Sequence, residues 1–149
     1  MKLQVKVDIE GSREEVWKVI TDIENSVNFI TGIEKVEILE KPESGFKGLK
    51  WRETRTMFGQ TATEVMWITE SSEKEFYETR AESHGAVYTT RLTLTPGEKG
   101  TELSMVFGAE ILTLKSKIIA ALTGWMFAGM TRKALLADLE DIRKAIEKG

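Results

Sequence analysis

The last third of the chain, residues 114–147, constrains the fold most strongly, because its apolar residues recur at intervals of three and four positions. This spacing predicts one long helix with an apolar stripe on a single face. The stripe consists of Leu114, Ile118, Ala121, Leu122, Trp125, Ala128, Leu135, Leu136, Leu139, Ile142 and Ile146. In the second half, the opposite face is expected to lie in solvent and carries Lys133, Asp138, Asp141, Lys144 and Lys148. Such a stripe must be buried, so the preceding residues are expected to build a concave surface for the helix.

The first half of this helix, residues 118–130, is apolar nearly all round and holds no charged side chain. A membrane-spanning helix needs about 20 such residues, so no transmembrane segment is expected. Three alternatives stay open: burial on two sides, a lid over a cavity, or a partner surface, including a homodimer formed through residues 118–130. Gly124 and Gly129 each weaken the helix by about 1 kcal/mol relative to alanine, so a break near either is also open. A lid would use Trp125, Met126, Phe127 and Met130.

The N-terminal segment predicts one strand followed by two short helices. Residues 3–9 alternate between apolar and polar side chains, which is typical of a strand with one buried face. Ser12 and Glu15 have the spacing of a capping box, which starts a helix that runs to about Asp22. Asn25 or Ser26 can cap a second short helix that ends near residue 32.

Six further runs have the composition of strands, and short turn-forming segments separate them. These runs cover residues 33–41, 49–58, 61–69, 75–83, 87–95 and 102–110. Short connections imply antiparallel neighbours. The sequence therefore predicts an α+β fold, in which a curved seven-stranded antiparallel sheet wraps around the long C-terminal helix. His84 is expected in a turn, and the loop at residues 44–48 is expected at the mouth of the resulting hollow.

Composition narrows the classes of function. A chain of 149 residues is expected to form a single domain. Its net charge of −3 provides no basic patch for a nucleic-acid backbone, so no nucleic-acid partner is expected. The absence of cysteine and the single histidine argue against disulfides, thiolate chemistry and His- or Cys-based metal sites, and no cofactor is expected. The N-terminus lacks the pattern of an export signal, which favours a cytoplasmic location.

Four segments resemble motifs of a known family, and they occur along the whole chain in the same order as in that family. They are SREEVWKVITD at 12–22, FITGIEKV at 29–36, GLKWRETR at 48–55 and LLADLEDI at 135–142. They are similar to the polyketide cyclase/dehydrase and lipid-transport proteins of the START-like, or SRPBCC, superfamily. The resemblance implies a helix-grip fold with an apolar cavity between the curved sheet and the final helix. Members of this superfamily include lipid and hormone carriers, aromatic cyclases and chaperone regulators, and they share no catalytic residue, so the fold does not select a function.

Strand alternation predicts which side chains face the cavity. On the third strand, the side chains expected to face the cavity are Trp51, Glu53, Arg55 and Met57. On the other strands, they are Met66, Ile68, Tyr88, Leu92, Leu94, Leu103, Met105 and Phe107. The fifth strand is ambiguous, and its less charged set is Tyr77, Thr79, Ala81 and Ser83. The predicted ligand-binding residues are Trp51, Glu53, Arg55, Met66, Tyr77, Tyr88, Met105, Phe107, Trp125, Met126 and Arg132.

Three charged residues in this set allow alternative interpretations. Glu53 and Arg55 can bind the polar end of a ligand, or Glu53 can act as a general base with a pKa raised by burial. They can equally form an internal ion pair, or face solvent if the strand is inverted. Arg132 falls in the apolar stripe of the long helix, where a charge is unexpected. It can reach inward to Glu53, Glu64 or a ligand carboxylate, or it can extend outward into solvent.

These observations leave three functions open. The first is a binding protein for a hydrophobic small molecule or lipid, which the expected cavity favours. The second is a polyketide cyclase or dehydratase-like enzyme, in which Glu53, Tyr77 or Tyr88 acts as acid or base. The third is a partner-binding module that uses the apolar surface of residues 118–130.

Overall fold

The computed structural model describes every residue except 1, 58, 84 and 149, and side chains 57, 83, 116 and 119–127 also lie outside the description. The predicted turn position of His84 therefore falls outside the described residues. The elements are β1 (Lys2–Ile9), α1 (Arg13–Thr21), the 3-10 helix η1 (Ile23–Asn28), β2 (Ile33–Glu40), β3 (Lys50–Met57), β4 (Gln60–Ser72), β5 (Phe76–Ser83), β6 (Ala86–Pro96), β7 (Thr101–Ile111) and α2 (Leu114–Lys148).

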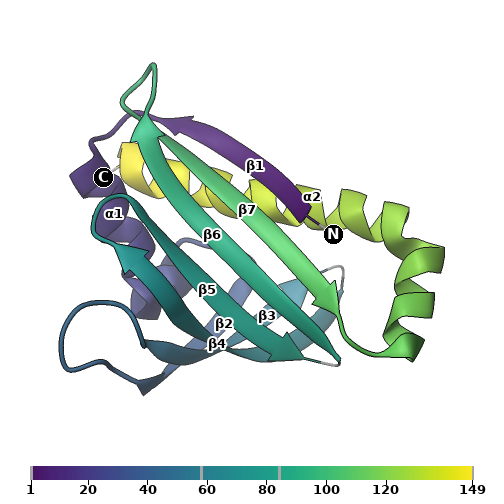
Figure 1. Ribbon diagram of the computed structural model, residues 1–149. Helices are drawn as coiled ribbons and strands as arrows, with labels where there is room; N and C mark the ends of the chain where they lie inside the picture. The colour runs from purple at the N-terminus through teal and green to yellow at the C-terminus, as the bar shows by residue number, and fades with distance from the viewer. Residues whose placement is uncertain (1, 58, 84, 149) are drawn as a thin grey trace.

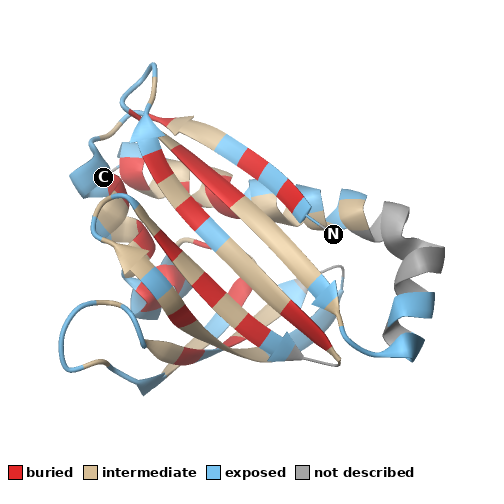
Figure 2. Ribbon diagram, in the orientation of Figure 1, coloured by how far each residue is buried: buried red, intermediate tan, exposed pale blue. Residues whose placement is uncertain are grey.

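The seven strands form one sheet in the order β1-β7-β6-β5-β4-β3-β2, with every neighbouring pair antiparallel. The sheet curves, and α2 passes behind β1 and β7 (Figure 1). Side chains alternate between the two faces of each strand, so buried and exposed residues alternate along β1, where Leu3 and Val5 are buried and Gln4 is exposed (Figure 2). The predicted α+β helix-grip fold is confirmed.

The two short helices follow β1 as expected, but the second differs in its bounds. The backbone N–H of Glu15 donates to Ser12 Oγ at 3.2 Å, and the N–H of Ser12 donates to Glu15 Oε1 at 3.2 Å, which completes the capping box of α1. The 3-10 helix begins at Ile23 rather than at Asn25 or Ser26. Ser26 does not cap it, because its hydroxyl donates to the Ile23 carbonyl at 2.7 Å within the helix.

The C-terminal helix α2 is continuous from Leu114 to Lys148, so the backbone does not leave the helical conformation at either glycine. Its first turns run in a different direction from its last turns and extend beyond the sheet (Figure 1). Among the described residues, no helix has an apolar stretch of sufficient length to cross a membrane.

Among its described residues, the predicted apolar stripe of α2 is buried only in its C-terminal half. Leu139 and Ile142 are buried in the core with Ile146. Leu114 and Ile118, with 75% and 54% exposure, are wrongly predicted as buried, because the first turns of the helix lie beyond the sheet that would cover them. Leu136 is 40% exposed and is also wrongly assigned. It follows Leu135, the leucine of this pair that packs against the core, and is rotated about 100° from it around the helix axis.

Candidate ligand-binding cavity

A cavity of about 480 Å³ lies between the sheet and α2, with α1 and η1 over one part of it. Strands β3 to β7 contribute Trp51, Glu53, Arg55, Gln60, Ala62, Glu64, Met66, Tyr77, Thr79, Ala81, Tyr88, Thr90, Leu92, Met105 and Phe107. The helices, the two residues after η1 and the first residue of β2 contribute Val19, Ile20, Ile23, Ser26, Phe29, Ile30, Ile33, Met130, Thr131, Ala134, Leu135, Asp138 and Ile142. Most of these side chains are apolar, because the sheet and the helices all turn their apolar faces toward this space.

The described lining residues that are exposed to solvent lie at the start of β4 and on α2. Gln60, Ala62 and Met130 line the cavity and are nevertheless exposed to solvent, whereas most of the other lining residues are buried or half-buried. No residue of the loop at 44–48 lines the cavity, so the prediction that this loop lies at its mouth is wrong. Its Phe46 instead packs edge-on against Trp17 and Tyr77, with ring centroids 6.3 and 5.1 Å apart.

Strand alternation predicted the inward faces well. The structure brings together at the cavity wall Trp51, Glu53, Arg55, Met66, Tyr77, Tyr88, Met105 and Phe107. On β5, Thr79 and Ala81 join Tyr77, which resolves the ambiguous face of that strand. The predicted lid residues Trp125, Met126 and Phe127 have side chains outside the described part of the chain, as do Met57 and Ser83.

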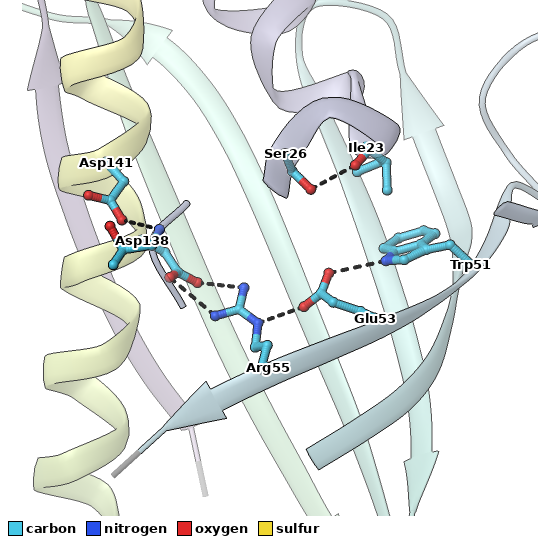
Figure 3. Close-up of polar contacts among 8 residues, drawn as sticks. Ile23, Ser26, Trp51, Glu53, Arg55, Asp138 and Asp141 are labelled. Carbon is cyan, nitrogen blue, oxygen red and sulfur yellow. Dashed lines mark hydrogen bonds and ion pairs between the residues drawn. The ribbon is translucent and has the colours of Figure 1, made fainter. Parts of the chain in front are cut away.

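Charged side chains cross the cavity wall in one continuous network (Figure 3). The indole N–H of Trp51 donates to Glu53 Oε1 at 3.2 Å, and Arg55 Nε donates to Glu53 Oε2 at 2.6 Å. On its other side, Arg55 Nη1 donates to Asp138 Oδ1 at 3.2 Å, and Nη2 lies 2.8 Å from Asp138 Oδ2. The internal ion pair considered from the sequence is therefore present, and it extends from β3 to α2.

Asp138 corrects a prediction, since it was expected on the solvent face of the long helix. Its residue exposure is 8%, and it faces Arg55 across the cavity wall. Burial raises the pKa of Asp138 above its ordinary value, and the nearby charge of Arg55 opposes this effect without cancelling it. Burial alone would lower the pKa of Arg55, but the charges of Asp138 and Glu53 outweigh it and raise that pKa above its ordinary range.

The two tyrosines of the cavity occupy different environments. Tyr77 is buried, and its hydroxyl donates to the Ile20 carbonyl at 3.1 Å. Burial raises its pKa, and the charge of Glu53 adds to the rise. Tyr88 is half-buried and stacks on Phe107, with ring centroids 5.9 Å apart. Burial also raises the pKa of Tyr88, with a contribution from the charge of Glu64.

Arg132 does not line the cavity, so its predicted place among the ligand-binding residues is wrong. It is exposed, and its Nη1 donates to the backbone carbonyl of Gln4 on β1 at 2.8 Å. This contact corresponds to the outward alternative. A long, flexible side chain can leave the stripe at which its Cα lies and keep its charge in water.

Sequence reasoning missed Asp138 as a cavity residue, although a signal was present. Asp138 follows Leu135 by three positions and precedes Ile142 by four, so helical spacing places all three on one face. It also missed the contribution of the first two helices, in which Ile20 and Ile23 line the cavity.

The sequence from residue 1 to residue 147 matches the family model for polyketide cyclase/dehydrase and lipid transport proteins. No curated protein matches the sequence. Solved structures do match the fold at low sequence identity. TTHA0849 from Thermus thermophilus has a TM-score of 0.83 and 13% identity, with 99% of this chain and 98% of that chain covered.

Two further structures have the same arrangement. A START superfamily protein from Mycobacterium smegmatis has a TM-score of 0.82 and 16% identity, over 99% of this chain and 97% of that chain. The Zhui aromatase/cyclase from Streptomyces sp. R1128 has a TM-score of 0.76 and 15% identity, over 99% of this chain and 94% of that chain. Likeness at these identities shows a shared fold.

Proposed function

Because the chain belongs to the polyketide cyclase/dehydrase and lipid transport family, we propose that it binds a hydrophobic small molecule or lipid in the cavity between the sheet and α2. The observation that carries this proposal is the cavity itself. Its volume of about 480 Å³ lies within the range of about 300–1,000 Å³ typical of small-molecule sites. The lining is largely apolar with a few convergent polar groups, which is the composition that such sites share.

The lining residues divide into two groups by the contacts that they offer a ligand. Trp51, Tyr88 and Phe107 present aromatic surface, and Met66 and Met105 add flexible apolar side chains that adapt to the shape of a ligand. The network of Glu53, Arg55 and Asp138 supplies the polar groups that would fix its orientation.

An enzymatic role has less support than binding. A general acid or base must reach the substrate with a proton or an unshared electron pair available. The hydroxyl of Tyr77 is already donated to the Ile20 carbonyl, and Glu53 accepts from both Trp51 and Arg55. An activity that used Tyr77 as its acid would need this hydrogen bond to rearrange, and protonation of Glu53 as a base would weaken its ion pair with Arg55, whereas binding needs neither change.

The partner-binding alternative rests on residues 118–130. Most of their side chains lie outside the described part of the chain, so their surface offers no contact from which to argue. Light scattering tests this alternative directly, because a homodimer formed through this segment has twice the mass of the chain.

The binding proposal is tested with N-phenyl-1-naphthylamine, an uncharged probe whose fluorescence increases in an apolar site. We expect saturable binding to the wild-type protein. Thr90 lines the cavity and Thr89, its neighbour on β6, does not, so the two positions form a matched pair. Thr90→Phe should fill part of the cavity and weaken binding by about tenfold or more, since about 1.4 kcal/mol of lost contact has that effect.

Thr89→Phe adds the same side chain to the other face of the sheet and should leave the affinity unchanged. Urea unfolding of both variants checks that each remains folded. Absence of saturable binding to the wild type, or equal loss of affinity in both variants, would contradict a binding site at this cavity.

A further inference from the structure

We propose that this cavity selects its ligand by charge: it accepts an apolar molecule that is uncharged or cationic and excludes one that carries a carboxylate or another anionic group. This inference rests on the proposed binding function and specifies the class of ligand. It follows from the balance of charges around the cavity and from the two carboxylates that already contact the guanidinium of Arg55.

Carboxylates outnumber cations among the described side chains that line the cavity. Glu53, Glu64 and Asp138 are acidic, and Arg55 is the basic residue among them. Arg132, the other arginine considered from the sequence, lies outside the cavity and contacts β1. The undescribed side chains of residues 119–127 add no charge, because this part of the sequence contains no Asp, Glu, Lys, Arg or His. Along the described part of the cavity wall, an anion therefore meets an excess of like charge.

Arg55 is committed to two carboxylates and does not serve as an anion receptor. Its Nε donates to Glu53 at 2.6 Å, while Nη1 and Nη2 contact the two oxygens of Asp138 at 3.2 and 2.8 Å. Both carboxylates are largely buried, with side-chain exposures of 9% and 12%. A ligand carboxylate would have to compete with both for one positive charge in a site that solvent screens poorly.

The carboxylates retain capacity to accept hydrogen bonds. A carboxylate has about four lone-pair sites, and each oxygen of Glu53 and Asp138 accepts from one protein donor in the contacts described above. A ligand hydroxyl or ammonium group can donate to the remaining sites. The polar edge of the cavity is thus built to accept hydrogen bonds rather than to bind an anion.

The register of β3 and β4 places two of these carboxylates side by side. Glu53 and Glu64 are directly opposite each other on these neighbouring strands, and both face the cavity. Like charges in this arrangement destabilise a sheet. An anion bound between these strands and α2 would lie beside both carboxylates.

Three probes with one apolar body separate charge from size: 2-naphthalenemethanol, 2-naphthylmethylamine and 2-naphthoate, which at neutral pH are uncharged, cationic and anionic. Each is titrated against bound N-phenyl-1-naphthylamine on the wild-type protein. We expect the alcohol and the amine to displace the reporter, and the carboxylate to bind at least ~10-fold more weakly, as like-charge contacts predict. A carboxylate that binds as tightly as the alcohol overturns the inference.

Two variants locate the effect. Glu64→Gln removes one cavity charge and should improve 2-naphthoate binding by about fivefold or more while leaving the alcohol within about twofold. Glu82→Gln, on β5, makes the same change of net charge at an exposed position that does not line the cavity, and should alter neither. Naphthoate binding that Glu64→Gln does not improve also overturns the inference.

The two proposals fail in distinguishable ways. If the reporter binds but the three probes do not differ, charge selection fails and the binding function stands. If neither the reporter nor any naphthalene probe binds the wild type, the binding function fails and charge selection fails with it.

Discussion

Arg55 on β3 and Asp138 on α2 form a two-point ion pair that joins the sheet to the C-terminal helix. Their side chains meet at 2.8 Å and 3.2 Å although 83 positions separate the residues in the sequence. With side-chain exposures of 25% and 12%, neither is well solvated. Removal of Asp138 would leave Arg55 paired with Glu53, whereas removal of Arg55 would leave two carboxylates with charges that water compensates poorly.

Asp138→Ala should lower the free energy of unfolding by about 2 kcal/mol, because it removes charge-assisted hydrogen bonds while Arg55 stays in the cavity wall with Glu53 as its partner. Urea unfolding measures the change. The matched control is Asp141→Ala on the same helix, where the partly exposed carboxylate accepts the backbone N–H of Thr31 at 2.9 Å (Figure 3). Loss of that hydrogen bond should cost about 1 kcal/mol. Equal effects at the two positions would show that the ion pair contributes nothing beyond a hydrogen bond.

Leu139 and Leu136 provide a direct test of how α2 is oriented. Leu139 is fully buried, so Leu139→Ala should destabilise the protein by about 3 kcal/mol through lost contacts and a residual cavity. Leu136 is 40% exposed, and Leu136→Ala should change stability by less than about 0.5 kcal/mol. Thermal and urea unfolding of the two variants give the comparison. The reverse order would mean that the helix is rotated relative to the sheet.

Phe46 ties the loop between β2 and β3 to the core. Phe46→Ala removes its edge-on contacts with Trp17 and Tyr77 and should lower stability by about 2 kcal/mol, given that the side chain is partly buried. Tryptophan fluorescence should also change, because Trp17 loses a neighbour. Lys47→Ala in the same loop is the control and should have little effect on either measurement. A loop that tolerates Phe46→Ala at no cost would not be anchored by this ring.

Glu147 links the end of α2 to the segment after β1 and should make stability depend on pH. The backbone N–H of Glu10 donates to Glu147 and, with the neighbouring Arg143, lowers the pKa of its carboxyl from the ordinary 4.5. Between the lowered and the ordinary pKa the unfolded chain binds more protons than the folded chain, so stability rises with pH in this window. The contribution is complete above the ordinary pKa and is lost as the pH falls through the lowered one.

Glu147→Gln should therefore be less stable than the wild type at neutral pH, and the difference should shrink as the pH falls below about 4.5. Thermal melts across this range measure it. Glu43→Gln, in the loop between β2 and β3, makes the same change of charge at an exposed residue and serves as the control. A difference that stays constant down to acid pH would show that ionisation of Glu147 plays no part.

Local patterns in the sequence were sufficient to predict where the strands lie. Period-two alternation and turn-forming residues located all the strand-like runs close to their observed bounds, and the capping box located α1. The inward face of β3 followed from Trp51 and its alternating neighbours. The family resemblance drawn from four short segments is confirmed over residues 1–147. These features are determined by residues that are close together in the sequence, so the sequence alone was sufficient to predict them.

The faces of α2 were less accessible to prediction, because burial there depends on where the sheet ends. Leu114 and Ile118 have the spacing of a buried stripe but lie on turns that extend beyond the strands. Asp138 has the spacing of a buried residue, but its charge suggested solvent, since its partner Arg55 is remote in sequence. Only the tertiary structure pairs the two and explains why a carboxylate is tolerated at that position.

The contact between Arg132 and Gln4 has a consequence for association between molecules. β1 and β2 are the edge strands of the sheet, and an exposed edge is a template for strand addition and aggregation. At β1, the guanidinium of Arg132 donates to the Gln4 carbonyl, so this acceptor is not available to a strand from another chain. At β2, register shifts near Ile33 and Ile38 disturb the regular ladder. Each edge thus carries its own protection against the addition of a strand from another chain.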